Sequence, residues 1–157
     1  MPDMLVKLYT LPPLEPEMEA MRAAGVDLRR GLPPEKHIVT AWVRQHFSAA
    51  WGSECDVAMS HHPVSCFVAT ENNRLLGFAC YDATIKGFFG PTGVDEAARG
   101  RGIGRALLLA CLHDMRAQGY GYGIIGAAGP TGFYEKAVGA MSIEDSWPGI
   151  YRGILRG

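Results

Sequence analysis

The residues of this chain best suited to chemistry form a short segment, residues 99–104, with the sequence RGRGIG. Three glycines take alternate positions in it, and a strongly apolar run starts directly afterwards at Arg105. That run predicts a helix, and the free amides at a helix N-terminus, together with the helix dipole, attract an anion. Glycines let the backbone approach a phosphate closely. The pattern therefore predicts a phosphate-binding loop, in which each amide contact contributes roughly 1.5–3 kcal/mol against about 0.3–1 for the dipole.

Spacing excludes two common phosphate-binding motifs. A dinucleotide fingerprint has glycines at relative positions 1, 3 and 6, but the third position falls on Arg105 counted from Gly100, and on Leu107 counted from Gly102. A nucleoside-triphosphate loop needs Gly-Lys followed by Ser or Thr, and the chain has no Gly-Lys pair. The ligand of the loop is thus neither a dinucleotide nor a nucleoside triphosphate held in these ways.

The segments that must position the loop are predicted from the spacing of their apolar residues, which differs between strands and helices. Alternating or β-branched segments predict strands, and apolar residues at a spacing of 3.6 predict helices. The predicted strands span residues 4–11, 64–70, 75–84, 87–94, 122–128, 141–143 and 149–155, and the predicted helices span residues 15–24, 34–47, 51–60, 105–118 and 132–138. This order predicts a mixed α/β fold in a single layered domain, residues 1–157.

Composition limits the partners. Fifteen basic and sixteen acidic residues leave a net charge of −1, so we expect no nucleic-acid partner. The first twenty residues lack a cationic end with an uninterrupted apolar core, and no segment suits a membrane span. The four cysteines lie far apart without metal-ligand spacing, which predicts reduced thiols in a cytoplasmic protein without a metal. The composition is compatible with either a monomer or a homodimer.

The loop and its surroundings resemble the GNAT superfamily of N-acetyltransferases. Its pyrophosphate-binding signature is Arg or Gln, two residues, Gly, one residue, then Gly or Ala, which Arg99, Gly102 and Gly104 match. The family usually ends a strand in valine five residues earlier, where Val94 stands, and residues 133–136 (FYEK) resemble its later motif. The resemblance implies a central, mostly antiparallel sheet, splayed between its fourth and fifth strands, flanked by helices, and with acetyl-CoA as co-substrate.

The resemblance also implies which residues hold acetyl-CoA. It implies that residues 99–105 bind the pyrophosphate and that the end of the fourth strand, residues 92–94, binds the pantetheine arm. The bulge that opens the cleft between the splayed strands fits Gly90-Pro91. The implied acetyl-CoA residues are Thr92, Gly93, Val94, Arg99, Gly100, Arg101, Gly102, Ile103, Gly104 and Arg105.

The implied reaction is direct attack of a primary amine, on a small molecule or a peptide, on the thioester. Tyr134 matches the family tyrosine that faces the sulfur, so we expect it to be the catalytic proton donor to the leaving thiolate. A phenol of pKa about 10 can hydrogen-bond a thiolate of pKa about 8.5 while staying neutral.

The proton acceptor is less well defined by the sequence. Deprotonating an amine of pKa about 10.4 at pH 7 costs roughly 4.6 kcal/mol, yet residues 87–94 contain no acid. Relatives often have Asn where this chain has Ala127. Asp82, His61 and His62 are substitutes for a base, and proton loss through water is the default.

Two questions stay open at the level of sequence. One is whether the domain is a non-catalytic acyl-CoA-binding sensor, an alternative motivated by the missing base and the missing Asn. The other is whether four aromatic side chains line a pocket for the acceptor or pack in the core: Trp42, His46, Trp51 and Trp147.

Overall fold

In the computed structural model, which describes residues 1–157, seven strands form one sheet in the order β2-β3-β4-β5-β6-β1-β7. All neighbouring strands are antiparallel except β5 and β6. The strands are β1 (Met4–Lys7), β2 (Asp27–Arg30), β3 (Cys66–Glu71), β4 (Arg74–Tyr81), β5 (Phe88–Val94), β6 (Tyr122–Ile125) and β7 (Met141–Ser142). The predicted mixed α/β fold with a mostly antiparallel sheet is confirmed.

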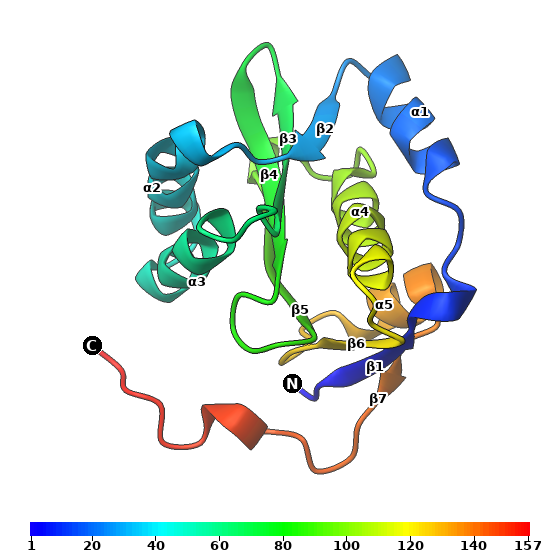
Figure 1. Ribbon diagram of the computed structural model, residues 1–157, viewed down its shortest axis with the longest axis vertical. Helices are drawn as coiled ribbons and strands as arrows, with labels where there is room; N and C mark the ends of the chain where they lie inside the picture. Colours follow the sequence, from blue (N-terminus) through cyan, green and yellow to red (C-terminus); the bar gives the residue numbers. More distant parts are fainter.

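Five helices cover the two faces of this sheet. They are α1 (Glu15–Ala23), α2 (Lys36–His46), α3 (Ala49–Met59), α4 (Ile103–Ala117) and α5 (Thr131–Val138). Helices α2 and α3 lie on one face of strands β3 to β5, and α4 lies on the other with α1 outside it (Figure 1). No helix combines the length and hydrophobicity that crossing a bilayer requires.

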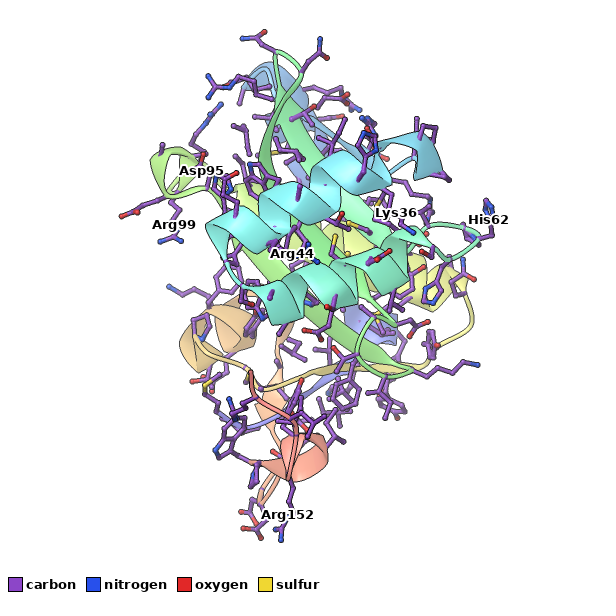
Figure 2. The ribbon with its side chains drawn as sticks, turned by 90° about the vertical axis from the view of Figure 1, so that its left-hand side faces the viewer. Lys36, Arg44, His62, Asp95, Arg99 and Arg152 are labelled. Atoms are coloured by element: carbon purple, nitrogen blue, oxygen red, sulfur yellow. The ribbon has the colours of Figure 1, made fainter.

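The alternation of side chains along β4 explains why both faces are covered. Phe78 and Cys80 point into a core shared with α2 and α3, whereas Ala79 and Tyr81 point into a larger core built around α4. Every second residue of a strand points to the same face, so a strand that is apolar on both faces needs a layer on each side. The result is a sheet between two helical layers, seen from the side of α2 and α3 in Figure 2.

The sheet splays where β5 meets β6. These strands pair only through Phe88 with Ile124 and Phe89 with Ile125. Just beyond, Gly90 and Pro91 lie opposite the single residue Cys80, because Ala79 pairs with Thr92 and Tyr81 with Phe89. This bulge bends β5 away from β6. The predicted splay and bulge are therefore confirmed, although the extra strand β2 makes the splayed pair the fifth and sixth strands of the chain.

Two predicted elements near the ends of the chain differ from the structure. The strand predicted over residues 4–11 ends at Lys7 and continues as a 3-10 turn, Leu8–Thr10. The strand predicted over residues 149–155 is wrong, because Gly149–Tyr151 is a 3-10 turn and the following residues have no regular structure. The outer edge of β1 is already taken by β7, which is two residues long. The terminal segment instead runs beneath the sheet toward the side of α3 (Figure 1).

Candidate functional site

The glycine-rich loop presents a row of unpaired backbone amides. Gly100 and Gly102 both have φ of +81°, a conformation that favours glycine, and Gly102 is the residue from which α4 starts. The N–H groups of residues 100–105 donate to no acceptor in the protein; the first helical bond is from Ala106 N–H to the Gly102 carbonyl. Six consecutive free amides at a helix N-terminus form a cradle suited to a phosphate group.

The loop borders a cleft of about 770 Å³, the main cleft. Its walls come from the end of β5, the loop, the start of α4 and the start of α5. It is lined by Phe47, Trp51, Thr92, Gly93, Val94, Ala98, Arg99, Gly100, Gly102, Ile103, Gly104, Arg105, Leu108, Pro130, Phe133 and Tyr134. The structure thus brings Tyr134 and all of the predicted acetyl-CoA residues except Arg101 together around one cleft.

The three arginines of the loop have different surroundings. Arg99 takes part in no ion pair, and its Nε donates to the Val94 carbonyl at 3.3 Å. It projects outward at the margin of the molecule, near Asp95 (Figure 2). The Arg101 side chain leaves the cleft and pairs with Glu71 at 2.8 Å. Arg105 lines the cleft but pairs with Glu17, also at 2.8 Å. Only the guanidinium of Arg99 is free of a carboxylate.

The end of β5 forms one wall of the main cleft as an unpaired strand edge. Residues Thr92 to Val94 of β5 pair with β4 but have no partner on the side of β6. The Thr92 hydroxyl donates to the Phe78 carbonyl at 3.1 Å, which ties this stretch to β4. A free strand edge can bond an extended ligand as an added strand would. An extended ligand with amide groups could therefore form hydrogen bonds with this free edge, next to the phosphate cradle.

Tyr134 lies on α5 with its ring buried and its hydroxyl toward the main cleft. Its side chain is 6% exposed, and its ring packs edge to face on Phe89 with centroids 6.5 Å apart. Burial raises the pKa of Tyr134 to about 12. The hydroxyl makes no hydrogen bond within the protein and is not sealed from solvent. It stays protonated at neutral pH and is available to donate a proton to a group in the cleft.

A second pocket, the α3 pocket, lies beyond the bulge and has a volume of about 280 Å³. Its floor is formed where β5 and β6 part, and its walls come from α3 and from the terminal segment of the chain. It is lined by Met1, Ala50, Trp51, Glu54, Thr84, Phe89, Gly90, Pro91, Gly126, Ala127, Trp147, Tyr151, Ile154 and Arg156. Trp51 lines both hollows, and Phe89 lines the α3 pocket while it packs against Tyr134. The two hollows therefore lie next to each other and share Trp51 as a common wall.

Glu54 is the one carboxylate among the residues of the α3 pocket. Ser48 caps the N-terminus of α3 by accepting from Trp51 N–H, and the helix then carries Glu54 one turn further along. Glu54 is half-buried, accepts a hydrogen bond from the Thr84 hydroxyl and has no cationic partner. Burial raises the pKa of Glu54, and the bond from Thr84 opposes that shift.

Sequence reasoning missed Glu54. An acid on a helix is usually a solvated residue, and the side chain that holds Glu54, Thr84, comes 30 positions later in the chain. The apolar residues Trp51 and Cys55 beside it were the signal available, since they place that face of α3 against the sheet.

The other candidates for a base lie outside both hollows. Asp82 accepts from Gly87 N–H and from the Tyr120 hydroxyl, so it closes the turn before β5. His61 bonds Ser65, and His62 is exposed beside it on the far side of α3. Among the four aromatic candidates, Trp51 and Trp147 line the α3 pocket. Trp42 stacks on His46 and packs against the core under α2.

Comparison with known proteins identifies the family of the chain. The sequence profile of the acetyltransferase (GNAT) family matches residues 28–140. A comparison with curated proteins gives no match.

Several solved structures have a similar fold. A GCN5-related glucosamine N-acetyltransferase region of a fungal multi-domain β-N-acetylglucosaminidase gives a TM-score of 0.73 at 16% identity, covering 90% of this chain and 19% of that one. A GCN5-related N-acetyltransferase from Sphaerobacter thermophilus gives 0.66 at 22% identity, covering 90% and 48%. A Drosophila protein gives 0.57 at 12% identity, covering 90% and 47%. This chain spans half or less of the length of these relatives, and the likeness is one of fold.

Proposed function

The chain belongs to the GNAT acetyltransferase family, and from that premise we propose that it transfers an acetyl group from acetyl-CoA to a primary amine. The observation that carries the proposal is the main cleft, which joins a phosphate cradle, a free strand edge and the accessible hydroxyl of a tyrosine whose ring is buried. Each of these matches one part of a thioester substrate with a pyrophosphate, an amide-bearing arm and a sulfur.

The residues of the cleft are chemically suited to acetyl-CoA. A Cβ atom added at Gly104 would meet only Val94, at 3.8 Å, so a ligand group can approach this backbone closely. The free amides of residues 100–105 would bond the pyrophosphate, Arg99 would add charge, and the edge of residues 92–94 would bond the pantetheine amides. The four buried free cysteines suit a reducing compartment, so we include a cytoplasmic location in the proposal.

Tyr134 would act as the general acid. Attack by the amine expels a thiolate, which needs a proton or a strong hydrogen bond as the carbon–sulfur bond breaks. A phenol whose pKa is raised to about 12 stays neutral across the working range and donates in that step. Its ring is fixed by Phe89 and Phe133, so the hydroxyl is held in place rather than free to rotate away.

The experiment that tests the proposal measures thiol release from acetyl-CoA in the presence of a panel of primary amines, with acetyl-CoA binding followed separately by calorimetry. We expect saturable thiol release for at least one class of amine. Tyr134→Phe should lower kcat by about 10² or more while leaving the Kd for acetyl-CoA within threefold. Tyr122→Phe, which removes an exposed hydroxyl bonded only to Tyr9, is the control.

Two outcomes would contradict the proposal. Tight binding of acetyl-CoA with no thiol release for any amine would favour a non-catalytic sensor. Unchanged turnover in Tyr134→Phe between pH 7 and pH 9 would remove the tyrosine from the mechanism.

A further inference from the structure

We propose that the α3 pocket binds a small primary amine with an apolar or aromatic body, and that Glu54 pairs with its ammonium group and takes its proton. This inference rests on the proposed acetyl transfer, and it assigns the acceptor class and the base that the sequence leaves undefined.

The position of the α3 pocket suits an acceptor. It opens on the residues where β5 and β6 part, Gly90-Pro91 on one strand and Gly126 on the other. Trp51 forms part of its wall and part of the wall of the main cleft. In the proposed arrangement, an amine in the α3 pocket would reach a thioester held beside Tyr134 by passing Trp51.

The walls of the pocket define the body of the acceptor. Eight of its fourteen residues are apolar, and the rings of Trp147 and Tyr151 lie together with centroids 6.1 Å apart. Its volume of about 280 Å³ lies just below the usual range for small-ligand sites, about 300–1,000 Å³. Apolar and aromatic walls around a small volume favour a compact amine over an aminoglycoside or a long peptide, and aromatic faces also attract a cation.

Glu54 supplies the polar contact that such a pocket needs. Its carboxylate is half-buried and lacks a cationic partner within the chain, so an ammonium group would replace solvation lost on folding. The residues lining the pocket that carry a charged or titratable group are Met1, through its α-amino group, Glu54 on α3, and Tyr151 and Arg156 in the terminal segment. The pKa of Tyr151 is raised by burial and by the nearby charge of Glu54, so its hydroxyl stays neutral. Glu54 is the only carboxylate among these groups.

The reaction balances with these two side chains. Glu54 takes one proton from the ammonium group, and the freed nitrogen lone pair forms a bond to the thioester carbon. The carbon–sulfur bond breaks with its electron pair on sulfur, which receives the proton of Tyr134. The nitrogen loses a second proton as the amide forms, and this proton restores Tyr134 through solvent. Glu54 releases its proton to solvent, so the products are the amide, the free thiol and one proton.

The first test compares acceptors with the wild-type protein. Thiol release is measured at pH 7 with 2-phenylethylamine, tryptamine, hexylamine, a lysine-containing peptide and kanamycin. We expect kcat/KM to be at least tenfold higher for one of the three small apolar amines than for the peptide or kanamycin. Trp147→Ala should raise KM for the aromatic amines at least fivefold and leave KM for acetyl-CoA unchanged. A preference for the peptide or kanamycin overturns the proposed acceptor class.

The second test assigns the base with Glu54→Gln. We expect kcat/KM to fall about 10²-fold at pH 7, and the loss to shrink as pH rises, because without the base the rate follows the neutral fraction of the amine, about tenfold per pH unit below its pKa. Glu54→Asp keeps the carboxylate and should recover part of the rate. Asp56→Asn is the matched control, since it removes an exposed acid of the same helix that pairs with Lys36.

Acetyl-CoA binding separates this inference from the proposed function. Glu54→Gln should bind acetyl-CoA as the wild type does, which also shows that it folds. If the wild type is active and Glu54→Gln keeps its rate and pH profile, the role of Glu54 is overturned while acetyl transfer stands. If the wild type binds no acetyl-CoA, or acetylates no amine, the proposed function fails and this inference fails with it.

Discussion

The ring of Phe47 covers the backbone of Gly93 so closely that a Cβ atom at position 93 would lie 2.3 Å from the ring. Phe47 follows the last residue of α2, and Gly93 lies on β5 opposite Phe78. This contact seats the α2–α3 layer on the strand that forms a wall of the main cleft. The glycine at position 93 is therefore required by packing within the protein, whatever a ligand needs there.

Gly93→Ala should destabilise the fold. The added methyl group would force Phe47 off its position, and inserting a methyl group into a well-packed site costs about 1–3 kcal/mol. Urea unfolding should show this loss in the free energy of unfolding. The double variant Gly93→Ala with Phe47→Leu makes room for the methyl group and should recover stability relative to the sum of the two single changes. Strict additivity of the two would show that the contact does not carry the effect.

Gly104→Ala should have the opposite profile. A Cβ atom at this position meets only Val94, at the ordinary distance of 3.8 Å, so we expect the free energy of unfolding to stay within about 0.5 kcal/mol of wild type. The methyl group would stand between the amides of the loop and a phosphate. Loss of one charge-assisted contact, roughly 1.5–3 kcal/mol, corresponds to a Kd for acetyl-CoA raised about 10- to 100-fold in calorimetry. Gly121→Ala, where a Cβ atom would meet nothing within 4 Å, is the control.

Arg99 and Arg101 should differ although both belong to the signature loop. Arg99→Gln removes a guanidinium that has no carboxylate partner, and we expect it to weaken acetyl-CoA binding about tenfold at low salt. Arg101→Gln removes one that is already paired with Glu71, and we expect a change of less than threefold. Calorimetry at 20 mM and 300 mM salt checks both, because screening should shrink the effect of Arg99. Equal effects of the two variants would contradict this assignment.

The pair between Arg30 on β2 and Asp114 on α4 should make stability depend on pH. Two bonds of 2.8 Å join the guanidinium to the carboxylate, and the Tyr81 hydroxyl donates a third. Burial alone would raise the pKa of Asp114, but the bonds from Arg30 and Tyr81 outweigh it and hold the pKa below its usual value. A carboxyl with a depressed pKa stabilises the fold above its unfolded-state pKa of about 3.9, and this stabilisation is lost as pH falls through the folded-state value.

Asp114→Asn should therefore lower the free energy of unfolding by about 1–2 kcal/mol at pH 7, allowing for the partial exposure of Arg30. The difference from wild type should shrink below about pH 4, where Asp114 of the wild type begins to be protonated. Urea unfolding from pH 7 to pH 2.5 measures both. Asp27→Asn, an exposed acid 3.9 Å from Arg29, should change little at any pH. A pH-independent difference for Asp114→Asn would rule out the ionic contribution.

The parts of the molecule that local sequence determines are the parts that could be predicted. Gly100, Gly102 and the apolar run after them specify a turn into a helix within one short segment, and Gly90-Pro91 specifies the bulge in the same way. Strand β2 was missed because its four residues are mostly charged and become a strand only by pairing with β3. The strand predicted over residues 149–155 is wrong for the converse reason, since its apolar residues pair with no strand and Ile150, Ile154 and Leu155 stay exposed.

The candidate site also contains residues that the local sequence identifies and residues that only the tertiary structure identifies. Tyr134 is recognisable from the residues next to it, whereas Glu54 acquires its surroundings from Thr84 and Tyr151, which the fold brings from distant positions. Asp82 is the opposite case. From the sequence it is a candidate base, but in the structure its carboxylate accepts hydrogen bonds from Gly87 N–H and the Tyr120 hydroxyl. Which polar side chains remain unpaired is a property of tertiary structure.

Because the terminal segment crosses beneath the sheet, part of the wall of the α3 pocket is structurally independent of the main cleft. Trp147 and Tyr151 reach the α3 pocket from a stretch of chain with little buried surface and no regular strand, whereas the main cleft is built on α4 and the central sheet. Substitutions in that stretch disturb few packed neighbours and leave the loop of free amides intact. With the acceptor bound as proposed, substitutions at residues 147–156 would alter which amine is accepted and leave the proposed acetyl-CoA site unchanged.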